Sequence, residues 1–396
     1  MSERNLDFDT VIDRTNHNCL KYDFAVQRGK PEGILPLWVA DMDFRISSYI
    51  QDALTEQVEH GIYGYSEATA DYYDALISWF GRKYNWQIQA DWVIKTPSVV
   101  VALALAVQAY TESGDSVLIQ QPVYYPFSEV ITDNGRNIVD NTLIRHEDGS
   151  YTIDFQDFEE KTARDEVKLF LLCNPHNPSG RVFTREELTR MGEICLKNHV
   201  IVVSDEIHQD FTWEGNKHVV FAGIKDSFRD ITITCTSPSK AFNIAGLHIA
   251  NIMIANPDLR SSFKARMNAI GYSQLNAAGL AVCKAAYRQG QEWLDAVTDY
   301  IEANIDYTLE YLENNIPQIS CRKPEGTYLL WMDCRRLGLN DDELDDLVIN
   351  KANLWLDSGA IFGDSGKGFQ RINVACPRVT LKRALDQLRD AVRQRN

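Results

Sequence analysis

The sequence predicts an α/β protein, with a large domain built on a mostly parallel central sheet and a smaller α+β domain. The main observation is that the middle of the chain alternates short β-rich runs with helical patterns, which is typical of a parallel sheet covered by helices. The C-terminal part instead combines short strand patterns with one amphipathic helix. At 396 residues the chain is also too long for one small core, so a second domain is expected.

Four strands of the large domain are predicted from runs that are almost continuously apolar, as expected where both faces of a sheet are covered. These runs span residues 116–120, 168–173, 200–204 and 230–235. A fifth run, 248–255, follows the fourth after only about a dozen residues, which leaves little room for a helical crossover. The fifth strand is therefore predicted to lie antiparallel to the fourth.

Three helical patterns stand out between and after these strands. Residues 99–111 are apolar nearly all round, which predicts a buried helix. The stretch 184–197 opens with Thr184 and carries Glu187 three positions later, the pattern of a capping box. In residues 292–315 apolar side chains recur every three or four positions, so we expect a long amphipathic helix that leads out of the large domain.

We expect residues 46–288 to form the large domain, and residues 1–45 together with 289–396 to form the small one. The C-terminal part carries shorter patterns, namely two strand-like pieces at 320–333 on either side of a Pro-Glu-Gly turn, another strand at 369–375 and an amphipathic helix at 379–393.

Composition argues against several classes of protein. A formal charge of −16 is unsuited to a nucleic-acid-binding surface, which needs clustered lysine and arginine. The first residues lack a signal-peptide pattern, and no apolar run approaches the roughly 18–20 residues of a membrane span. Eight cysteines are scattered without a CxxC pair, and eight histidines show no metal-ligand spacing. We therefore expect a cytoplasmic protein with reduced thiols, no metal, and neither nucleic acid nor membrane as a partner.

Two reactive residues follow predicted strands, at the sheet edge where open parallel sheets bind ligands. Asp205 ends an apolar strand, where an unpaired carboxylate would be costly; it could pair with a protonated pyridine nitrogen, or it could cap a helix or pair with an arginine. Lys240 follows the next strand and could form a Schiff base if its pKa is lowered. Ser237 and Ser239 beside it offer hydroxyls to a phosphate. Alone, this S-x-S-K pattern is weak, because most lysines are solvated.

Three further residues occupy the same edge. Asn177 belongs to the second of two Asn-Pro pairs, in which the residue before proline is held extended. This would present its amide as a hydrogen-bond donor; a simple turn is the alternative. Tyr124 could stack on a planar cofactor, or pack in the core. Ser98 precedes a helix start, whose free N–H groups bind phosphate well; a simple helix cap is compatible with that role. Together these groups suit a phosphorylated, planar aldehyde cofactor.

The motifs around Asn177, Asp205 and Lys240 are NPHNPSG, SDEIH and SPSK. They resemble those of the fold-type I pyridoxal-5′-phosphate enzymes of the aspartate aminotransferase superfamily, which are class I/II aminotransferase-like. Within it, one branch is similar over nearly the whole chain: the MalY/PatB-type cystathionine β-lyases, or C–S lyases. That closer resemblance rests on PLWVADMDF (36–44), GIYGY (61–65), TPSVVVAL (96–103), SKAFNIAGL (239–247) and RINVACPR (371–378).

The resemblance implies a role for each matching residue. Lys240 would bind the cofactor as a Schiff base and then act as the base at the substrate Cα. Arg371 would bind the substrate α-carboxylate in a forked geometry that lysine cannot copy. Tyr65 would reach the phosphate of the other subunit, making a homodimer the active unit. The other cofactor contacts would be Asp205 to the pyridine nitrogen, Asn177 to the ring hydroxyl oxygen, Tyr124 to the ring face, and Ser98, Val99, Val100, Ser237 and Ser239 to the phosphate.

Two histidines depart from the aminotransferase pattern. His208 stands three residues after Asp205, where aminotransferases usually carry a tyrosine to the ring oxygen, and we retain it as a candidate cofactor ligand. His248 stands eight residues after Lys240, where many carry a phosphate-binding arginine. Both departures favour the lyase branch, although a purely structural role for each histidine stays open.

The implied activity is α,β-elimination from cysteine thioethers, converting L-cystathionine to homocysteine, pyruvate and ammonia. An aminotransferase on the same scaffold is the nearest alternative, because the two reactions share their first steps. A regulatory protein-binding platform is an alternative of another class, since some members of the branch are reported to modulate a transcription regulator.

Overall fold

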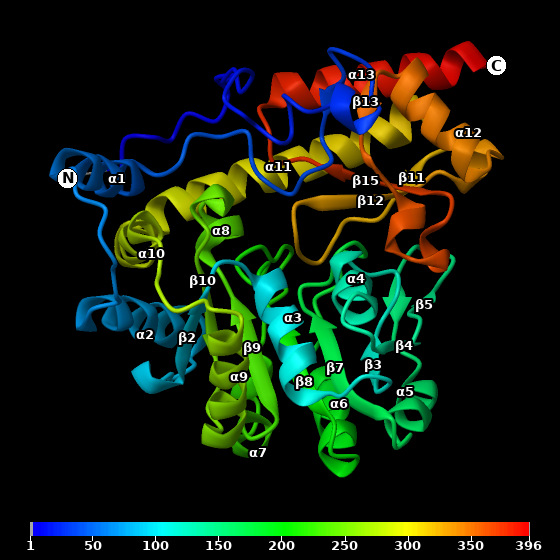
Figure 1. Ribbon diagram of the computed structural model, residues 1–396. Coiled ribbons are helices and arrows are strands. Elements are labelled where there is room, and N and C mark those ends of the chain that lie inside the picture. The colour runs from blue at the N-terminus through cyan, green and yellow to red at the C-terminus, as the bar shows by residue number, and fades with distance from the viewer. Residues whose placement is uncertain (1–2, 396) are drawn as a thin grey trace.

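The computed structural model describes residues 3–395. Figure 1 shows the central sheet and its helices in the lower part of the molecule, with the long helix α11 (Gln291–Asn315) and the C-terminal helix α13 (Arg378–Arg395) lying across the top. Within these residues, no helix is both long and apolar enough to cross a membrane.

The central sheet has seven strands in the order β2-β10-β9-β8-β7-β3-β4. Strand β10 is antiparallel to both of its neighbours, and every other pair is parallel. The mostly parallel sheet and its antiparallel fifth strand are thus confirmed. The strands are β2 (Val93–Thr96), β3 (Ser116–Ile119), β4 (Asn137–Asp140), β7 (Val167–Cys173), β8 (Ile201–Asp205), β9 (Thr232–Thr236) and β10 (Ala250–Met253).

Strands β2 and β4 lie at the two edges of the sheet and were not expected from the sequence. Strand β4 leaves Asn137 exposed and the rest only half-buried, and β2 contains Lys95. Neither segment is a continuous apolar run. In β4 the side chains are incompletely covered because an edge strand has only one neighbour, whereas β2 is mostly buried but is short and contains a lysine and a threonine.

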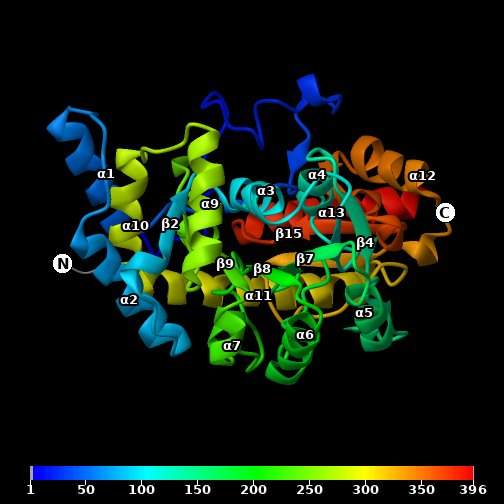
Figure 2. The same cartoon turned by 60° about the horizontal axis from the view of Figure 1, so that its bottom comes forward.

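Helices cover both faces of the sheet (Figure 2). Along β7, Leu169 and Leu171 pack in one core cluster with α3 (Val99–Tyr110), while Phe170 and Leu172 pack in another with α6 (Arg185–Lys197). This alternation explains why the strand is apolar at nearly every position. The prediction of a buried helix is confirmed, since no residue of α3 is exposed, and Thr184 and Glu187 form the predicted capping box at the start of α6.

The C-terminal part contains a four-stranded antiparallel sheet in the order β11-β12-β15-β14, and α11 and α13 pack on each other. The strand and helix predictions for this part are confirmed, but the domain boundaries at 45/46 and 288/289 stay a prediction. The elements are β11 (Ser320–Cys321), β12 (Leu329–Asp333), β13 (Leu354–Trp355), β14 (Asp357–Ser358), β15 (Phe369–Asn373) and α12 (Asp341–Asp346).

The N-terminal segment returns to the C-terminal part, because β1 (Leu35–Pro36) pairs in parallel with β13. After it, α1 (Ser48–His60) and α2 (Ala70–Tyr84) pack against α10 (Ala277–Gln289). The remaining elements are short or cover the sheet: α4 (Pro126–Thr132), β5 (Ile144–Arg145), β6 (Tyr151–Thr152), α5 (Phe155–Thr162), α7 (Asp226–Arg229), α8 (Pro238–Ala241) and α9 (Pro257–Ala269).

Candidate active site

A cavity of about 280 Å³ lies where the central parallel strands end and the N-terminal segment crosses them. All but one of the predicted site residues line it: Ser98, Val99, Val100, Tyr124, Asn177, Asp205, His208, Ser237, Ser239, Lys240 and Arg371. Tyr65 is the exception, since it lies between α1 and α2 with 94% of its surface exposed. The structure therefore brings together groups that are separated by up to several hundred residues in sequence.

Lys240 lies on the short helix α8, directly after β9. Its Nζ atom donates a hydrogen bond to the carbonyl oxygen of Ala40 at 2.7 Å. Burial lowers the pKa of Lys240 to about 8, an effect that Asp41 opposes and that Arg371 strengthens. An amine with this pKa is neutral in a useful fraction of molecules near pH 7–8, as a nucleophile or a proton acceptor must be.

Asp205 is the last residue of β8 and only 5% exposed. Burial raises its pKa to about 7, although the Ile207 N–H donates to Oδ1 at 3.1 Å and opposes the shift. Among residues 3–395 the carboxylate has no ion-pair partner, so the alternative of a carboxylate paired with an arginine is not what the structure shows. Such a group requires a cationic partner to stay ionised, and a protonated pyridine nitrogen meets that requirement.

The start of α3 provides the predicted anion site. Ser98 caps the helix, accepting a hydrogen bond from the Val101 N–H at 3.2 Å, and the next two residues line the cavity with it. The Ser237 hydroxyl is more constrained than expected, because it donates to the Ile249 carbonyl at 2.7 Å and accepts from the Ser239 N–H at 3.1 Å. The helix N–H groups are therefore the better phosphate donors here.

Arg371 lies on β15 opposite Asp357 of β14, and the two side chains form a buried ion pair. The guanidinium also donates to Asn177 Oδ1 at 2.9 Å and to the Trp38 carbonyl at 2.8 Å. Its buried Nε has no partner within the described residues. A carboxylate entering the cavity can therefore use a donor that the protein itself leaves unmatched.

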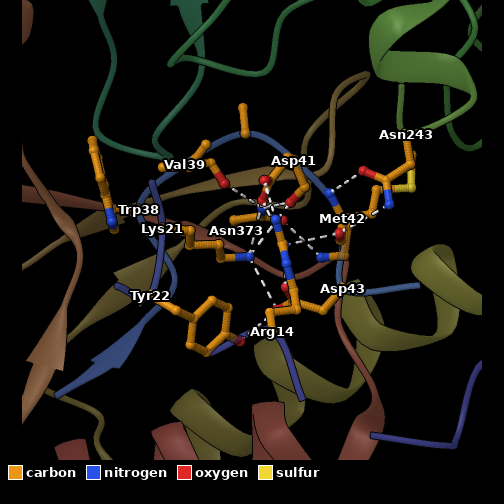
Figure 3. Close-up of polar contacts among 12 residues, drawn as sticks. Arg14, Lys21, Tyr22, Trp38, Val39, Asp41, Met42, Asp43, Asn243 and Asn373 are labelled. Carbon is orange, nitrogen blue, oxygen red and sulfur yellow. Dashed lines mark hydrogen bonds and ion pairs between the residues drawn. The ribbon is translucent and has the colours of Figure 1, made fainter. Parts of the chain in front are cut away.

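The segment 38–43, which we call the strap, provides a backbone carbonyl acceptor to Lys240 and another to Arg371. Besides the bonds from Lys240 and Arg371, it receives two from Asn373, whose Nδ2 donates to the carbonyls of Val39 and Asp41 at 2.7 and 2.6 Å. Figure 3 shows the two bonds from Asn373. Because its carbonyls are fixed on one side by β15, the strap presents the others to the cavity in a defined position.

An ion cluster fixes the other side of the strap (Figure 3). Arg14 forks onto Asp41 at 2.6 and 3.1 Å and reaches Asp43 at 2.6 Å, while the fully buried Lys21 lies 3.0 Å from Asp43 and 3.3 Å from Asp41. Burial alone would raise the pKa of Asp41, but Lys21 and Arg14 outweigh it and hold the pKa below its usual value. Two cations and two anions balance, as buried charges must.

Comparison with known proteins identifies the family. Residues 41–388 match Aminotransferase class I and II. The chain belongs to this family. It is 41% identical over 387 residues to cystathionine beta-lyase PatB of Bacillus subtilis (strain 168), covering 98% of this chain and 100% of that protein. The predicted resemblance to the PatB branch is thus confirmed.

Two solved structures are similar over 98% of this chain and 99% of theirs. One is a PLP-bound putative aminotransferase from Clostridium difficile 630, with a TM-score of 0.95 and 39% identity. The other is cystalysin from Treponema denticola, which contains a pyridoxal 5′-phosphate cofactor, with a TM-score of 0.95 and 37% identity. Likeness of this extent confirms the predicted fold of class I and II aminotransferases.

The two histidines that depart from the aminotransferase pattern both line the cavity. His208 is buried, and burial lowers its pKa far below the usual value, so the ring is neutral. Its Nδ1 has no partner among the described residues, and its ring lies edge-on to Tyr328 at 5.9 Å. Both histidines therefore lie in the cavity that holds the other predicted cofactor ligands, and their roles stay predictions. No group of three or more metal-ligating residues occurs in the described part of the chain.

Three features of the site were not predicted from the sequence. Asp357, in the two-residue strand β14, belongs to none of the sequence motifs described above. Tyr125 and Trp38 line the cavity, and Trp38 belongs to a motif that was used only to identify the family branch. Asp357 matters because it pairs in register with Arg371. The sequence alone does not reveal the register of two strands, so it gives no signal for this residue.

Proposed function

We propose that this protein is a pyridoxal-5′-phosphate-dependent C–S β-lyase. It converts cysteine thioethers such as L-cystathionine to a thiol, pyruvate and ammonia. The observation that carries the proposal is that Lys240, Asp205 and Arg371 all line one cavity, each in the environment that its role requires. The likeness to cystathionine beta-lyase PatB and to cystalysin supports this choice among the activities of the family.

The residues fit the cofactor. Lys240 would hold its aldehyde carbon, Asp205 its ring nitrogen, Asn177 its ring oxygen, and the start of α3 its phosphate, with Tyr124 against the ring. When bound, pyridoxal 5′-phosphate supplies an electron-accepting ring that stabilises negative charge at the substrate Cα. The carboxylate of Asp205 keeps a proton on the ring nitrogen, because a buried anion favours a cationic partner.

The remaining steps are carried by side chains of this protein. Arg371 binds the substrate α-carboxylate and so orients the Cα–H bond toward Lys240. The free ε-amine of Lys240 would take the Cα proton, and the Ala40 carbonyl, which accepts its hydrogen bond in this structure, would accept one from the resulting ammonium. Tyr124 and the neutral His208 keep the walls of the cavity free of further charge.

We also propose that the active unit is a homodimer in the cytoplasm. Tyr65 has 94% of its surface exposed, and Ile62 and Tyr63 on the same segment are 71% and 61% exposed, which is a surface that a second subunit would cover. Tyr65 could then reach the phosphate of the partner. All cysteines in residues 3–395 are free, in keeping with a reducing compartment.

One assay tests the activity and its main alternative. The purified protein is incubated with L-cystathionine, and pyruvate and free thiol are measured together, with and without a 2-oxo acid. We expect pyruvate and thiol in equal amounts, independent of the 2-oxo acid. Transfer of the amino group to the 2-oxo acid without thiol release would show an aminotransferase instead. If the protein neither released thiol and pyruvate nor transferred the amino group, both functions would be refuted.

A further inference from the structure

Two tryptophans stack beside the mouth of the active-site cavity, where Trp38 lines the cavity and Trp355, which is only 5% exposed, packs on it. The rings of Trp38 and Trp355 are parallel within 13° and 4.3 Å apart, because the pairing of β1 with β13 brings their segments side by side. Trp38 is itself partly exposed. The cavity wall therefore meets solvent at this point.

Two cations from one turn lie on this aromatic pair. The guanidinium of Arg28 is 5.7 Å from the ring of Trp38, and the ammonium of Lys30 is 5.9 Å from the ring of Trp355. The residue between them, Gly29, adopts a left-handed conformation with φ 71°, which reverses the chain after the short helix Val26–Arg28. The turn thus places both positive charges beside the stacked rings of Trp38 and Trp355.

Neither cation is neutralised by the protein. Among residues 3–395, no carboxylate lies within ion-pair distance of Arg28 or Lys30, whereas Arg371 is already paired with Asp357. Each of the two cations also interacts electrostatically with an ionisable side chain that lines the cavity. Burial raises the pKa of Tyr125, and Arg28 counteracts that shift; burial likewise raises the pKa of Asp357, and Lys30 counteracts it.

These charges contrast with the rest of the molecule. The chain carries a formal charge of −16, which repels anionic substrates at long range. A thioether substrate places its α-carboxylate on Arg371, and its sulfur substituent must then extend along the cavity toward solvent. A negative group at the far end of that substituent would reach the mouth, where Arg28 and Lys30 are available.

We infer that Arg28 and Lys30 form a subsite for an anionic group at the far end of the sulfur substituent, so that the preferred substrates are cysteine thioethers ending in a carboxylate. This inference rests on the proposed lyase function and specifies its substrate class. The Trp38–Trp355 pair holds the two cations in place, since cation–π contacts fix the position of a charge without neutralising it.

The test uses two thioethers of similar size and leaving group. S-(2-carboxyethyl)-L-cysteine ends in a carboxylate, and S-propyl-L-cysteine ends in a methyl group. The wild-type holoenzyme should show a higher kcat/KM with the anionic thioether. In Arg28→Gln and Lys30→Gln this preference should fall by about two- to fivefold for each substitution, as expected for loss of an exposed ion pair, while turnover of the neutral thioether stays unchanged. Added salt should weaken the wild-type preference.

Lys168→Gln is the matched control, because Lys168 is exposed and lies at the start of β7, away from the cavity. It should leave the preference intact. A double variant, Arg28→Glu with Lys30→Glu, should reverse the preference toward the cationic S-(2-aminoethyl)-L-cysteine. A gain of that kind cannot come from misfolding.

The outcomes separate the subsite from the lyase function. Equal losses with both thioethers, or an unchanged preference in both Gln variants, would overturn the subsite. If the wild type releases pyruvate from none of the thioethers, the lyase function fails, and the subsite is then judged from binding alone. Tryptophan fluorescence measures that binding: the anionic thioether should bind more tightly than the neutral one, and equal affinities in the wild type would overturn the inference.

Discussion

The Nζ atom of Lys240 donates a 2.7 Å hydrogen bond to the carbonyl oxygen of Ala40, 200 residues earlier in the chain. The side chain that is proposed to bind the cofactor is thus positioned by the strap. The strap in turn is fixed by Asn373 on one side and by the ion cluster around Arg14 on the other. The geometry of the reacting amine therefore depends on side chains that never touch it.

Replacing Lys240 by Ala should abolish the lyase activity. The variant loses both the covalent attachment of the cofactor and the base at Cα, and loss of a general base alone lowers rates by about 10²–10⁴-fold. Borohydride reduces the Schiff base and so fixes the cofactor to the lysine. Mass spectrometry should then detect the added mass of the cofactor on the wild type and not on the variant. Circular dichroism provides the control, since the fold should persist. Full activity in Lys240→Ala would contradict the assignment.

Replacing Asn373 by Ala should loosen the strap. The carbonyl of Val39 would lose its donor, and that of Asp41 would keep only the 3.5 Å contact from Lys21 Nζ. Because both carbonyls are only partly buried, the cost should lie near the lower end of the roughly 1–3 kcal/mol of an unsatisfied buried group. We expect a lower midpoint of urea unfolding together with a lower kcat, because the Ala40 carbonyl would be held against Lys240 less firmly, by the Tyr328 hydroxyl at 2.9 Å without its fixed neighbours.

Asn137→Ala is the control for this prediction. Its amide makes the same kind of bond, to the carbonyl of Gly114 at 2.8 Å, but on the surface and far from the cavity. Little change in stability or activity is expected there. A loss of stability in Asn373→Ala with an unchanged kcat would show that the strap does not position Lys240.

The sequence was sufficient for the five inner strands of the central sheet and for the reactive residues that follow them, but not for the edge strands β2 and β4. Strands such as β7 are covered on both faces and are apolar at nearly every position, so a local pattern reveals them. The reactive residues follow directly from those strands, which is why Asp205 and Lys240 could be assigned to one site before the structure was known.

The contacts between distant segments could not be predicted in this way. Arg14 and Lys21 lie in an N-terminal stretch without regular structure, and nothing in their neighbourhood indicates that they pair with Asp41 and Asp43 or that Lys21 becomes buried. Asp357 was missed for a related reason: its importance arises from its register opposite Arg371. Long-range pairing of charges is a property of the folded chain, whereas apolar periodicity is a property of the local sequence.

Binding of pyridoxal 5′-phosphate to the cofactor-free protein should depend on pH through Lys240. The amine must be unprotonated to attack the aldehyde, and burial lowers its pKa to about 8. The rate of Schiff-base formation, followed by absorbance, should therefore rise as the pH increases through about 8.

Asp41→Asn should move this midpoint. Asp41 stabilises the protonated amine and so opposes the lowering of the Lys240 pKa; without its charge the midpoint should shift to lower pH. The exposed Asp9→Asn is the control and should leave the midpoint in place. A shift to higher pH in Asp41→Asn would contradict the electrostatic account.

The stability of the protein should fall in mildly acidic solution because of His176. The ring is 1% exposed, with Nδ1 2.7 Å from the Ser179 hydroxyl and Nε2 3.2 Å from the Gln120 carbonyl. Burial lowers its pKa to about 4, and Arg181 adds to the effect. The unfolded chain therefore binds a proton that the folded chain excludes, between the ordinary pKa of 6.5 and about 4.

This difference in bound protons determines whether stability rises or falls with pH. Where the unfolded state binds more protons, the free energy of unfolding decreases as the pH falls, so stability is constant above about pH 6.5 with respect to this group and declines below it. A depression of this size corresponds to about 3 kcal/mol by pH 4. Urea unfolding at a fixed protein concentration, at several pH values from 7 to 5, measures it. In His176→Gln the decline should be shallower, and an identical pH dependence in wild type and variant would assign the acid sensitivity to other groups.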